Sequence, residues 1–198
     1  AYNLSTYNWD MIKTPGSIVI ISGPSGVGKG TLINALLDCR PNLRIAVSAT
    51  TRKPRENEVH GENYYFMSNT EFDHAIIEDD FLEWCQVHTN CYGSLKSQIL
   101  PLLQNGNNVL LEIDIQGAEK LRQQNYKLVT IFIAPPSLEI LSERLHKRDT
   151  EATEVIQKRL ATAKQEMAAT EKYDHVVVND DLKKAIEEIS NILDNLEE

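Results

Sequence analysis

The chain shows short apolar runs that alternate with stretches of helical periodicity. Four runs are nearly continuous and rich in β-branched residues, as expected for strands buried on both faces. They are Ile18–Ile21, Asn108–Asp114, Leu128–Ile133 and His175–Val178, and Leu43–Val47 is a shorter candidate. Because helical patterns separate these runs, the sequence predicts an α/β fold with a parallel sheet flanked by helices.

The helical patterns have recognisable starts and ends. Leu32, Ile33 and Leu36 share one face of a helix expected over about 29–39, which Pro41 ends. Further helices are expected over about 117–124, 137–148, 153–172 and 182–196. Each of these patterns is long enough to cover part of a sheet face.

The segment 48–97 differs in composition from the rest of the chain: it contains polar residues, paired basic residues and aromatic residues. Within it, Ser68–Glu71 has the spacing of a capping box before a helix, and a strand is expected over 81–87. A helix over 94–105 would contain Pro101, which costs about 3 kcal/mol in a helix interior. We therefore expect a kink or a later helix start there, and we interpret the segment as an insertion with its own small fold.

A glycine-rich turn, G-P-S-G-V-G-K-G-T, joins the first strand to the first helix. Gly23 and Gly28-Lys29 have the spacing of a Walker A loop. Such glycines let successive N–H groups form an anion-binding nest at a helix N-terminus, and the Lys29 ammonium can reach the β- and γ-phosphates. The alternative is a plain glycine-rich connection. We favour phosphate binding, with ATP contacts from Gly23, Pro24, Ser25, Gly26, Val27, Gly28, Lys29, Gly30 and Thr31.

One position of this loop is irregular. Gly30 stands where the usual pattern has Ser or Thr, and the hydroxyl arrives one residue later, in Thr31. The hydroxyl that contacts a metal ion is therefore left open.

The composition is ordinary for a globular protein, since 41% of the 198 residues are hydrophobic and 25% are charged. The net charge of −9 argues against a general affinity for nucleic acid or anionic membranes, so phosphate chemistry must depend on local Lys and Arg clusters. No apolar run approaches the roughly 20 residues of a membrane span, and no signal-peptide pattern is present. We expect no nucleic-acid or membrane partner and a cytoplasmic location.

The three cysteines, Cys39, Cys85 and Cys91, form no CxxC pair. Free thiols in a reducing cytosol fit best, and a redox pair of Cys85 with Cys91 is the less favoured alternative.

Two acids end the second long apolar run. Alternation along a strand puts Glu112 and Asp114 on the same side, near the carboxyl end of the strand, where open α/β sheets bind ligands. An acid there can hold Mg²⁺, directly or through water, beside a phosphate loop. A polar strand end that only faces solvent is the alternative.

Arginines gather in two further segments. Arg52 and Arg55 present planar forks that bind phosphate bidentately, and Pro54 stiffens the link between them. Two arginines in an acidic protein are more often surface charges, but these follow a strand directly. Arg144, Arg148 and Arg159 lie on two successive helices. A hinged arginine cluster beside a phosphate loop is what phosphoryl transfer needs, although alone it would indicate a solvated helix face.

With these motifs the sequence resembles the guanylate kinase family, over about residues 15–198. The resemblance rests on the phosphate loop and on S-A-T-T-R-K-P-R-E-N-E-V-H-G-E-N-Y-Y-F, E-I-D-I-Q-G-A, R-L-H-K-R-D-T-E and V-V-N-D-D. The motif E-I-D-I-Q-G-A resembles that of bacterial members of the family more than that of eukaryotic ones. The resemblance implies a P-loop nucleoside monophosphate kinase fold that transfers the γ-phosphate of ATP to GMP with Mg²⁺, giving ADP and GDP.

The resemblance also implies roles for single residues. Guanine-reading positions match Ser48, Glu83 and Ser94, and positions that hold the GMP phosphate match Arg52, Arg55, Tyr64 and Tyr92. An ionised Glu83 can accept the N1–H and N2–H₂ donors of guanine, a pair that adenine lacks. Glu112 and Asp114 match acids near GMP and Mg²⁺, Thr31 and Asp114 are the candidate metal contacts, and Arg144, Arg148 and Arg159 match lid arginines. Asn179 lies in the V-V-N-D-D segment, which in the family is near the adenine of ATP.

The resemblance divides the chain into parts of one domain. These are an N-terminal extension (1–14), a core (15–47, 98–143 and 173–198), a GMP-binding subdomain (48–97) and a mobile lid region (144–172). The sequence departs from the family at Gly30, at Asp149, which replaces a lid glycine, and at Pro101, for which the family offers no rationale.

Two other functions are compatible with parts of this pattern. A guanylate-kinase-like binding module for phosphorylated proteins would have degraded nucleotide motifs, whereas Lys29, Asp114 and the lid arginines are present here. A P-loop kinase for another phosphorylated acceptor is disfavoured by Glu83 with Ser48 and Ser94. The oligomeric state is left open.

Overall fold

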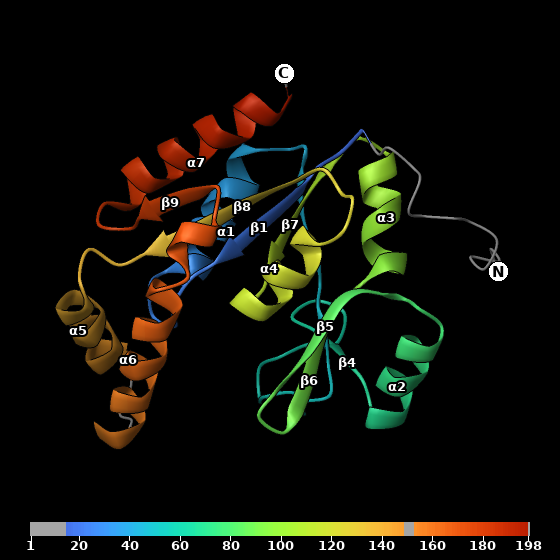
Figure 1. Ribbon diagram of the computed structural model, residues 1–198, viewed down its shortest axis with the longest axis horizontal. Helices are drawn as coiled ribbons and strands as arrows, with labels where there is room; N and C mark the ends of the chain where they lie inside the picture. Colours follow the sequence, from blue (N-terminus) through green and yellow to red (C-terminus); the bar gives the residue numbers. More distant parts are fainter. Residues whose placement is uncertain (1–14, 149–152, 198) are drawn as a thin grey trace.

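The computed structural model describes residues 15–148 and 153–197 (Figure 1). This part of the chain forms a five-stranded sheet and a separate four-stranded sheet. The expected extension 1–14 and the departure at Asp149 lie outside the described residues.

The five-stranded sheet is parallel throughout, with the order β2-β7-β1-β8-β9. Its strands are β1 (Ile18–Ser22), β2 (Leu43–Ile45), β7 (Asn108–Glu112), β8 (Leu128–Ala134) and β9 (His175–Val178). In the register, Ile21 lies opposite Glu112 and Ser22 lies opposite Phe132. The carboxyl ends of β1, β7 and β8 therefore meet at one edge of the sheet, where ligands bind in open α/β folds.

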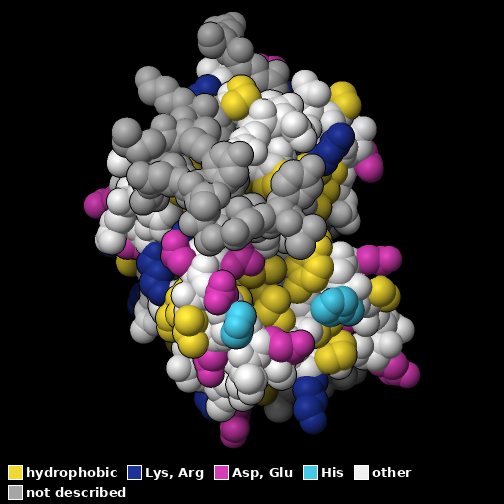
Figure 2. All heavy atoms as spheres, turned by 90° about the vertical axis from the view of Figure 1, so that its right-hand side faces the viewer, with side chains coloured by type: hydrophobic (Ala, Val, Ile, Leu, Met, Phe, Trp, Pro, Cys, Tyr) yellow, Lys and Arg dark blue, Asp and Glu magenta, His cyan; other side chains and the backbone are white. Residues whose placement is uncertain are grey.

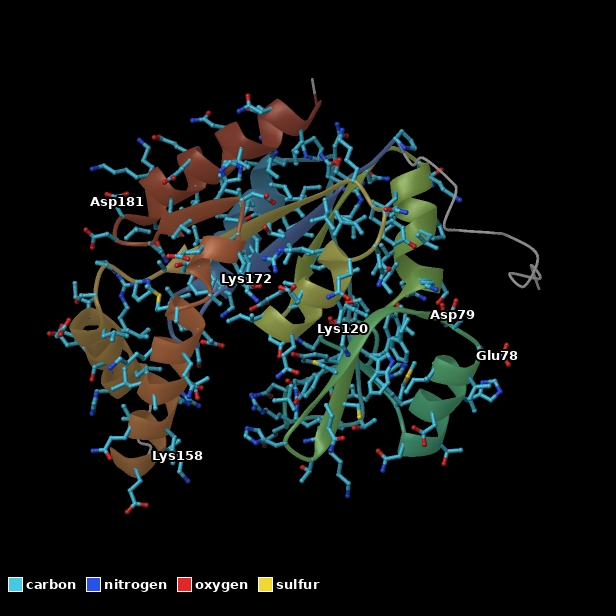
Figure 3. All side chains as sticks on the ribbon, viewed as in Figure 1. Glu78, Asp79, Lys120, Lys158, Lys172 and Asp181 are labelled. Carbon is cyan, nitrogen blue, oxygen red and sulfur yellow. The ribbon has the colours of Figure 1, made fainter. Side chains whose placement is uncertain are left out.

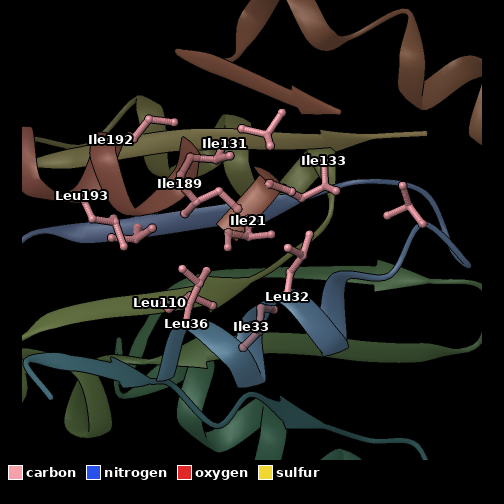
Figure 4. Close-up of a cluster of buried hydrophobic side chains, with 14 of the residues drawn as sticks. Ile21, Leu32, Ile33, Leu36, Leu110, Ile131, Ile133, Ile189, Ile192 and Leu193 are labelled. Atoms are coloured by element: carbon pink, nitrogen blue, oxygen red, sulfur yellow. The ribbon is translucent and has the colours of Figure 1, made fainter. Parts of the chain in front are cut away.

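Alternate residues of β1 enter opposite layers of the core. Val19 and Ile21 pack into a cluster with α1 (Lys29–Cys39) and α7 (Leu182–Glu197), part of which Figure 4 shows. Ile18 and Ile20 pack with α3 (Lys96–Gln104) and α4 (Ile115–Arg122). Burial on both faces explains why the strand is apolar at each position from Ile18 to Ile21.

The four-stranded sheet is mixed and has the order β4-β3-β6-β5. Its strands are β3 (Ala49–Thr50), β4 (Tyr65–Phe66), β5 (Phe81–Val87) and β6 (Asn90–Leu95). Helix α2 (Asn69–Ile77) covers it, with Phe72 stacked at 4.4 Å between ring centroids on Phe81. The expected capping box is present, since Ser68 Oγ accepts from Glu71 N and the Glu71 carboxylate accepts from Ser68 N.

The last helical arm consists of α5 (Leu138–Arg148) and α6 (Thr153–Met167), followed by a 3₁₀ turn (Thr170–Lys172). The two helices lie side by side at the lower left of Figure 1, across from the small sheet. Ser137 caps α5 as expected, because its Oγ accepts from Ile140 N at 3.2 Å.

Several element boundaries differ from the prediction. The helix expected over 94–105 begins at Lys96, because Ser94 and Leu95 belong to β6, and Pro101 lies inside it. The helix expected over 117–124 begins at Ile115, since the Asp114 carboxylate caps it. The helix expected over 153–172 ends at Met167, before the 3₁₀ turn.

Strands β3, β4 and β6 were not predicted. The first two have two residues each, and β6 contains Gly93 and Ser94, which seldom favour strands, so pairing with β5 determines its conformation.

The surface seen in Figure 2 shows no continuous basic patch among the described residues; Lys and Arg side chains are scattered between acidic and apolar ones. None of the helices within 15–148 and 153–197 combines the length and hydrophobicity that crossing a lipid bilayer requires.

Candidate active site

The phosphate loop connects β1 to α1 at the shared carboxyl edge of the sheet. Gly28 occupies the N-cap of α1 with φ of 98°, a left-handed conformation that favours glycine. Gly23 passes so close to β8 that a Cβ there would lie 2.4 Å from the Ile133 carbonyl oxygen. The loop therefore needs glycine at both positions. Its backbone N–H groups lie at the N-terminus of α1, where such groups bind an anion.

Lys29 lies over this loop. Its Nζ donates to the carbonyl oxygens of Gly23 at 2.5 Å and Pro24 at 3.2 Å. Burial lowers the pKa of the Lys29 ammonium, and the nearby carboxylates of Glu112 and Glu166 oppose that shift. The ammonium is thus held in place before any phosphate arrives.

Two adjoining cavities open beside the loop. The small cavity, of about 280 Å³, is lined by Lys29 among others. The large cavity, of about 630 Å³, is lined by Glu83 and Tyr92 among others. The lining residues common to both are Ser48, Tyr64, Glu112, Ile113, Asp114, Ile115 and Glu166. The cleft therefore runs from the phosphate loop to the small sheet, with α6 forming one wall.

Glu83 is the buried carboxylate of the large cavity. Only 5% of the residue is exposed, and its Oε1 accepts from Ser94 Oγ at 2.6 Å. Burial raises the pKa of the Glu83 carboxyl; the hydrogen bond from Ser94 works in the opposite direction. Because an unpaired buried charge is costly, this carboxylate is suited to a ligand that donates hydrogen bonds.

Helix α4 fixes the strand that carries Glu83. β5 is an edge strand, and α4 together with Gln124, just after its end, binds the backbone carbonyls on either side of Glu83. Gln124 Nε2 donates to Leu82 O at 2.6 Å, and Lys120 Nζ, labelled in Figure 3, donates to Trp84 O while its ammonium lies 5.0 Å from the centroid of the Trp84 ring. The core helix thereby sets the position of the carboxylate in the small sheet.

Gly117 of α4 makes this close approach possible. A Cβ at position 117 would lie 2.7 Å from Glu83 Oε2. If Glu83 reads guanine, as the resemblance implies, Gly117→Ala displaces its carboxylate and raises KM for GMP by about tenfold or more, because a misplaced buried acceptor loses its ligand bonds. KM for ATP should stay within twofold. Steady-state kinetics with each substrate varied in turn measures both values, and an equal rise in the two would contradict the expectation.

Arg52 is paired within the protein. Its Nη1 and Nη2 donate to the two Glu58 oxygens at 2.9 and 2.8 Å, and its guanidinium lies 5.3 Å from the Tyr64 ring centroid. The hydrogen bonds from Arg52 and from the backbone N–H of Arg55 lower the pKa of Glu58 to about 2. Tyr92 lies edge-on to Tyr64, whereas the Arg55 side chain is exposed. Sequence reasoning did not assign this orienting role to Glu58.

Glu112 and Asp114 both line the two cavities, but not as alternating residues of one strand, because β7 ends at Glu112 and Asp114 is the N-cap of α4. Asp114 caps α4, because its Oδ1 accepts from Gly117 N at 2.9 Å, and Cys85 Sγ lies 3.9 Å from its carboxylate. Burial, and then the neighbouring acids Asp114 and Glu83, raise the pKa of the Cys85 thiol to about 12. All three cysteines are free, so no disulfide joins Cys85 to Cys91.

The structure describes the side chains of two of the three arginines of the helical arm. Arg144 Nη1 donates to the Asn179 carbonyl oxygen at 2.9 Å, and Arg159 is half-buried on α6. Arg148 ends α5, and its side chain is outside the described set. Asn179 is buried behind the phosphate loop, while Ser25, Gly30 and Thr31 are exposed on it.

Glu166 is a residue of the cleft that the sequence reasoning missed. It lies on α6, lines both cavities and interacts electrostatically with Lys29, and burial raises the pKa of its carboxyl. Its position in the middle of a helical pattern carried no signal for a site.

A parallel sheet with a phosphate loop, an acidic strand end and a separate small sheet across the cleft defines a P-loop nucleoside monophosphate kinase. The guanylate kinase family model matches residues 16–196. Guanylate kinases of Caldanaerobacter subterraneus and Desulfitobacterium hafniense are 48% and 46% identical to the chain, covering 92% of it and 88% and 92% of their own lengths. The crystal structure of guanylate kinase from Anaplasma phagocytophilum matches with a TM-score of 0.74 and 34% identity, over 93% of this chain and 88% of that one.

The chain therefore belongs to the guanylate kinase family. It transfers a phosphoryl group from ATP to GMP and produces ADP and GDP. The prediction of the family and of this activity is confirmed, and the alternatives of a binding module or another acceptor are not supported.

Proposed function

We propose that GMP binds in the large cavity and that the ATP phosphates bind on the phosphate loop, so that the reacting groups meet beside Lys29. The observation that carries this proposal is the continuous cleft, with the buried Glu83–Ser94 pair at one end and Lys29 at the other. The seven residues that both cavities share would line the position where the two phosphates meet.

Glu83 reads guanine in this proposal. Its carboxylate accepts from N1–H and N2–H₂, and Ser48 donates to O6, because Ser94 gives its one hydroxyl proton to Glu83. The pair of buried groups rejects adenine, which would leave the carboxylate without donors. Helix α4 keeps the carboxylate in place through the contacts to β5.

Arg52, Arg55, Tyr64 and Tyr92 hold the GMP phosphate. Glu58 orients Arg52 by taking two of its five N–H donors, and the Lys53 carbonyl oxygen takes a third at 2.8 Å. The remaining donors serve the phosphate, which Tyr64 and Tyr92 contact from beside the guanidinium. Arg55 is exposed, so it would move inward as GMP binds.

Transfer proceeds by positioning and charge stabilisation, without a covalent intermediate. Lys29 stabilises charge on the migrating phosphoryl group. Arg144 is already held beside the phosphate loop by its bond to the Asn179 carbonyl oxygen, and the arm 144–172 acts as a lid that brings Arg148 and Arg159 toward the phosphates and keeps water out.

Mg²⁺ accompanies ATP in this proposal. Among the described residues no group of three or more His, Cys, Asp or Glu side chains could hold a metal alone, which fits Mg²⁺, since it binds through one or two protein groups and substrate phosphates. Asp114 and Thr31 would hold it, directly or through water, and the ion neutralises phosphate charge when bound.

The proposed contact between the Thr31 hydroxyl and Mg²⁺ can be tested by removing that hydroxyl and placing one at position 30 instead. We expect Thr31→Val to raise the Mg²⁺ concentration for half-maximal activity by roughly five- to tenfold, because one oxygen contact is lost. A Cβ at Gly30 would meet nothing within 4 Å, so Gly30→Ser can place a hydroxyl at the usual motif position. Adding Gly30→Ser to Thr31→Val should restore the Mg²⁺ response. An unchanged Mg²⁺ titration for Thr31→Val would remove Thr31 from the metal site.

The whole proposal is tested by a coupled ADP-release assay with ATP and each of GMP, AMP, CMP and UMP. GMP should exceed the others by at least 10³-fold in kcat/KM, since a site built for hydrogen bonds discriminates by about 10⁴–10⁵. Comparable turnover of AMP would contradict the assignment of Glu83. A cytoplasmic location is part of the proposal, because both substrates, ATP and GMP, are available in the cytoplasm.

A further inference from the structure

Asn179 follows β9 and lies behind the phosphate loop, with only 8% of the residue exposed. Its side-chain Nδ2 donates to the Val27 carbonyl oxygen at 2.9 Å, and its backbone N–H donates to Ala134 O at 2.9 Å. The residue therefore ties the loop to the carboxyl end of β8. Because the bond to Val27 is buried, water cannot easily replace the amide if it is removed.

The same amide packs against the last glycine of the loop. A Cβ at Gly28 would lie 2.6 Å from Asn179 Nδ2. Hydrogen bonding to Val27 and close packing on Gly28 together fix two successive peptide groups immediately before α1. These are the groups whose N–H donors form the anion-binding nest.

Helix α5 reaches the loop at two neighbouring residues. Arg144 Nη1 donates to the Asn179 carbonyl oxygen at 2.9 Å. Leu145 packs on the loop itself, because a Cβ at Gly26 would lie 2.7 Å from Leu145 Cδ2. The carboxyl-terminal half of α5 is thus anchored to the phosphate loop, directly by Leu145 and through Asn179 by Arg144.

We propose that Asn179 is a positioning residue that holds the phosphate loop in its anion-binding shape and joins it to α5 through Arg144. Its side chain acts on the triphosphate through Val27 and Gly28, and its effect does not depend on the adenine ring. The inference deepens the proposed use of the loop as the ATP phosphate site and rests on it.

The first experiment separates the phosphates from the base. Binding of ATP, inorganic tripolyphosphate and GMP to the full chain is measured by calorimetry for Asn179→Asp and Asn179→Ala. We expect ATP and tripolyphosphate to weaken by the same factor, about tenfold or more, while GMP stays within twofold. Asn191, exposed on α7, supplies the matched control, since Asn191→Asp should leave all three affinities unchanged.

The contrary results are distinct. Weaker ATP binding with unchanged tripolyphosphate binding would place Asn179 on the adenine, and unchanged binding of both would remove any role. Equal loss for all three ligands would indicate a general structural role, and thermal melting of each variant reports folding directly. Failure of the proposed phosphate site itself would appear differently, because the unmodified chain would then bind neither ATP nor tripolyphosphate.

A double-mutant cycle tests the contact with Gly28. Gly28→Ala adds a methyl group that collides with the Asn179 amide, and Asn179→Ala removes that amide. The unfavourable φ of an alanine at position 28 is present in both backgrounds and cancels in the cycle. We expect the double variant to lose clearly less tripolyphosphate affinity than the product of the two single losses. Strict additivity would contradict the positioning role.

Discussion

Replacing Lys29 with alanine is expected to lower kcat by roughly 10²- to 10³-fold and to change GMP affinity by less than about threefold. The ammonium is fixed over the loop by its bonds to Gly23 O and Pro24 O, at the end of the cleft away from Glu83. Its charge therefore acts on the migrating phosphoryl group more than on the bound acceptor. Single-turnover kinetics and GMP calorimetry measure the two effects separately.

Two variants sharpen this test. Lys29→Met keeps most of the side-chain length, so a loss like that of Lys29→Ala would assign the effect to the charge. Lys183→Ala removes an exposed lysine of α7 and should leave kcat unchanged. A loss of GMP affinity as large as the loss of kcat would contradict the proposed role of Lys29.

Replacing Glu83 with glutamine is expected to weaken GMP binding by roughly 10²- to 10³-fold, because a charged acceptor for two guanine donors is replaced by a neutral amide. The same variant should be at least as stable as the unmodified chain. Burial raises the pKa of Glu83, so the folded state disfavours its ionised form at neutral pH, and the amide removes that cost. Calorimetry and thermal melting give both results for each variant.

The pH dependence follows with a definite sign. A carboxyl whose pKa is raised on folding contributes stability below its unfolded pKa and loses that contribution as the pH rises through the folded pKa. GMP affinity should change in the opposite sense and fall as the pH is lowered toward the raised pKa of Glu83, since guanine needs the ionised form.

The exposed Glu143 of α5 provides the control, because Glu143→Gln should alter neither stability nor GMP binding. A Glu83→Gln variant that binds GMP normally would remove Glu83 from guanine recognition.

The core was predictable because its signals are local. β-Branched runs and a glycine-rich turn identified β1, the loop and α1, and α1 has the predicted bounds 29–39. Strands β5 and β9 also have their predicted bounds. In each case residues close in sequence determine the element, through spacing and capping.

The small sheet and the contacts behind the site were not predictable in the same way. β6 contains Gly93 and Ser94, and it is a strand because it pairs with β5. The pairing of Arg52 with Glu58 depends on how the loop between them turns back, and the position of Glu166 beside Lys29 depends on where separate segments meet. The sequence therefore identifies the chemical groups of the candidate site, and tertiary packing decides which of them contact one another.

The thiol of Cys85 has a consequence for oxidative chemistry. It lines the large cavity, but with a pKa of about 12 only about one thiol in 10⁵ is ionised at neutral pH. Alkylating agents and peroxides react with the thiolate, so the cavity carries a sulfur that resists both. Cys39, exposed at the far end of α1, offers such reagents a site remote from the cleft. A covalent label on Cys39 therefore lies away from the large cavity, and Cys91, half-buried on β6, is the other thiol that such labelling must spare.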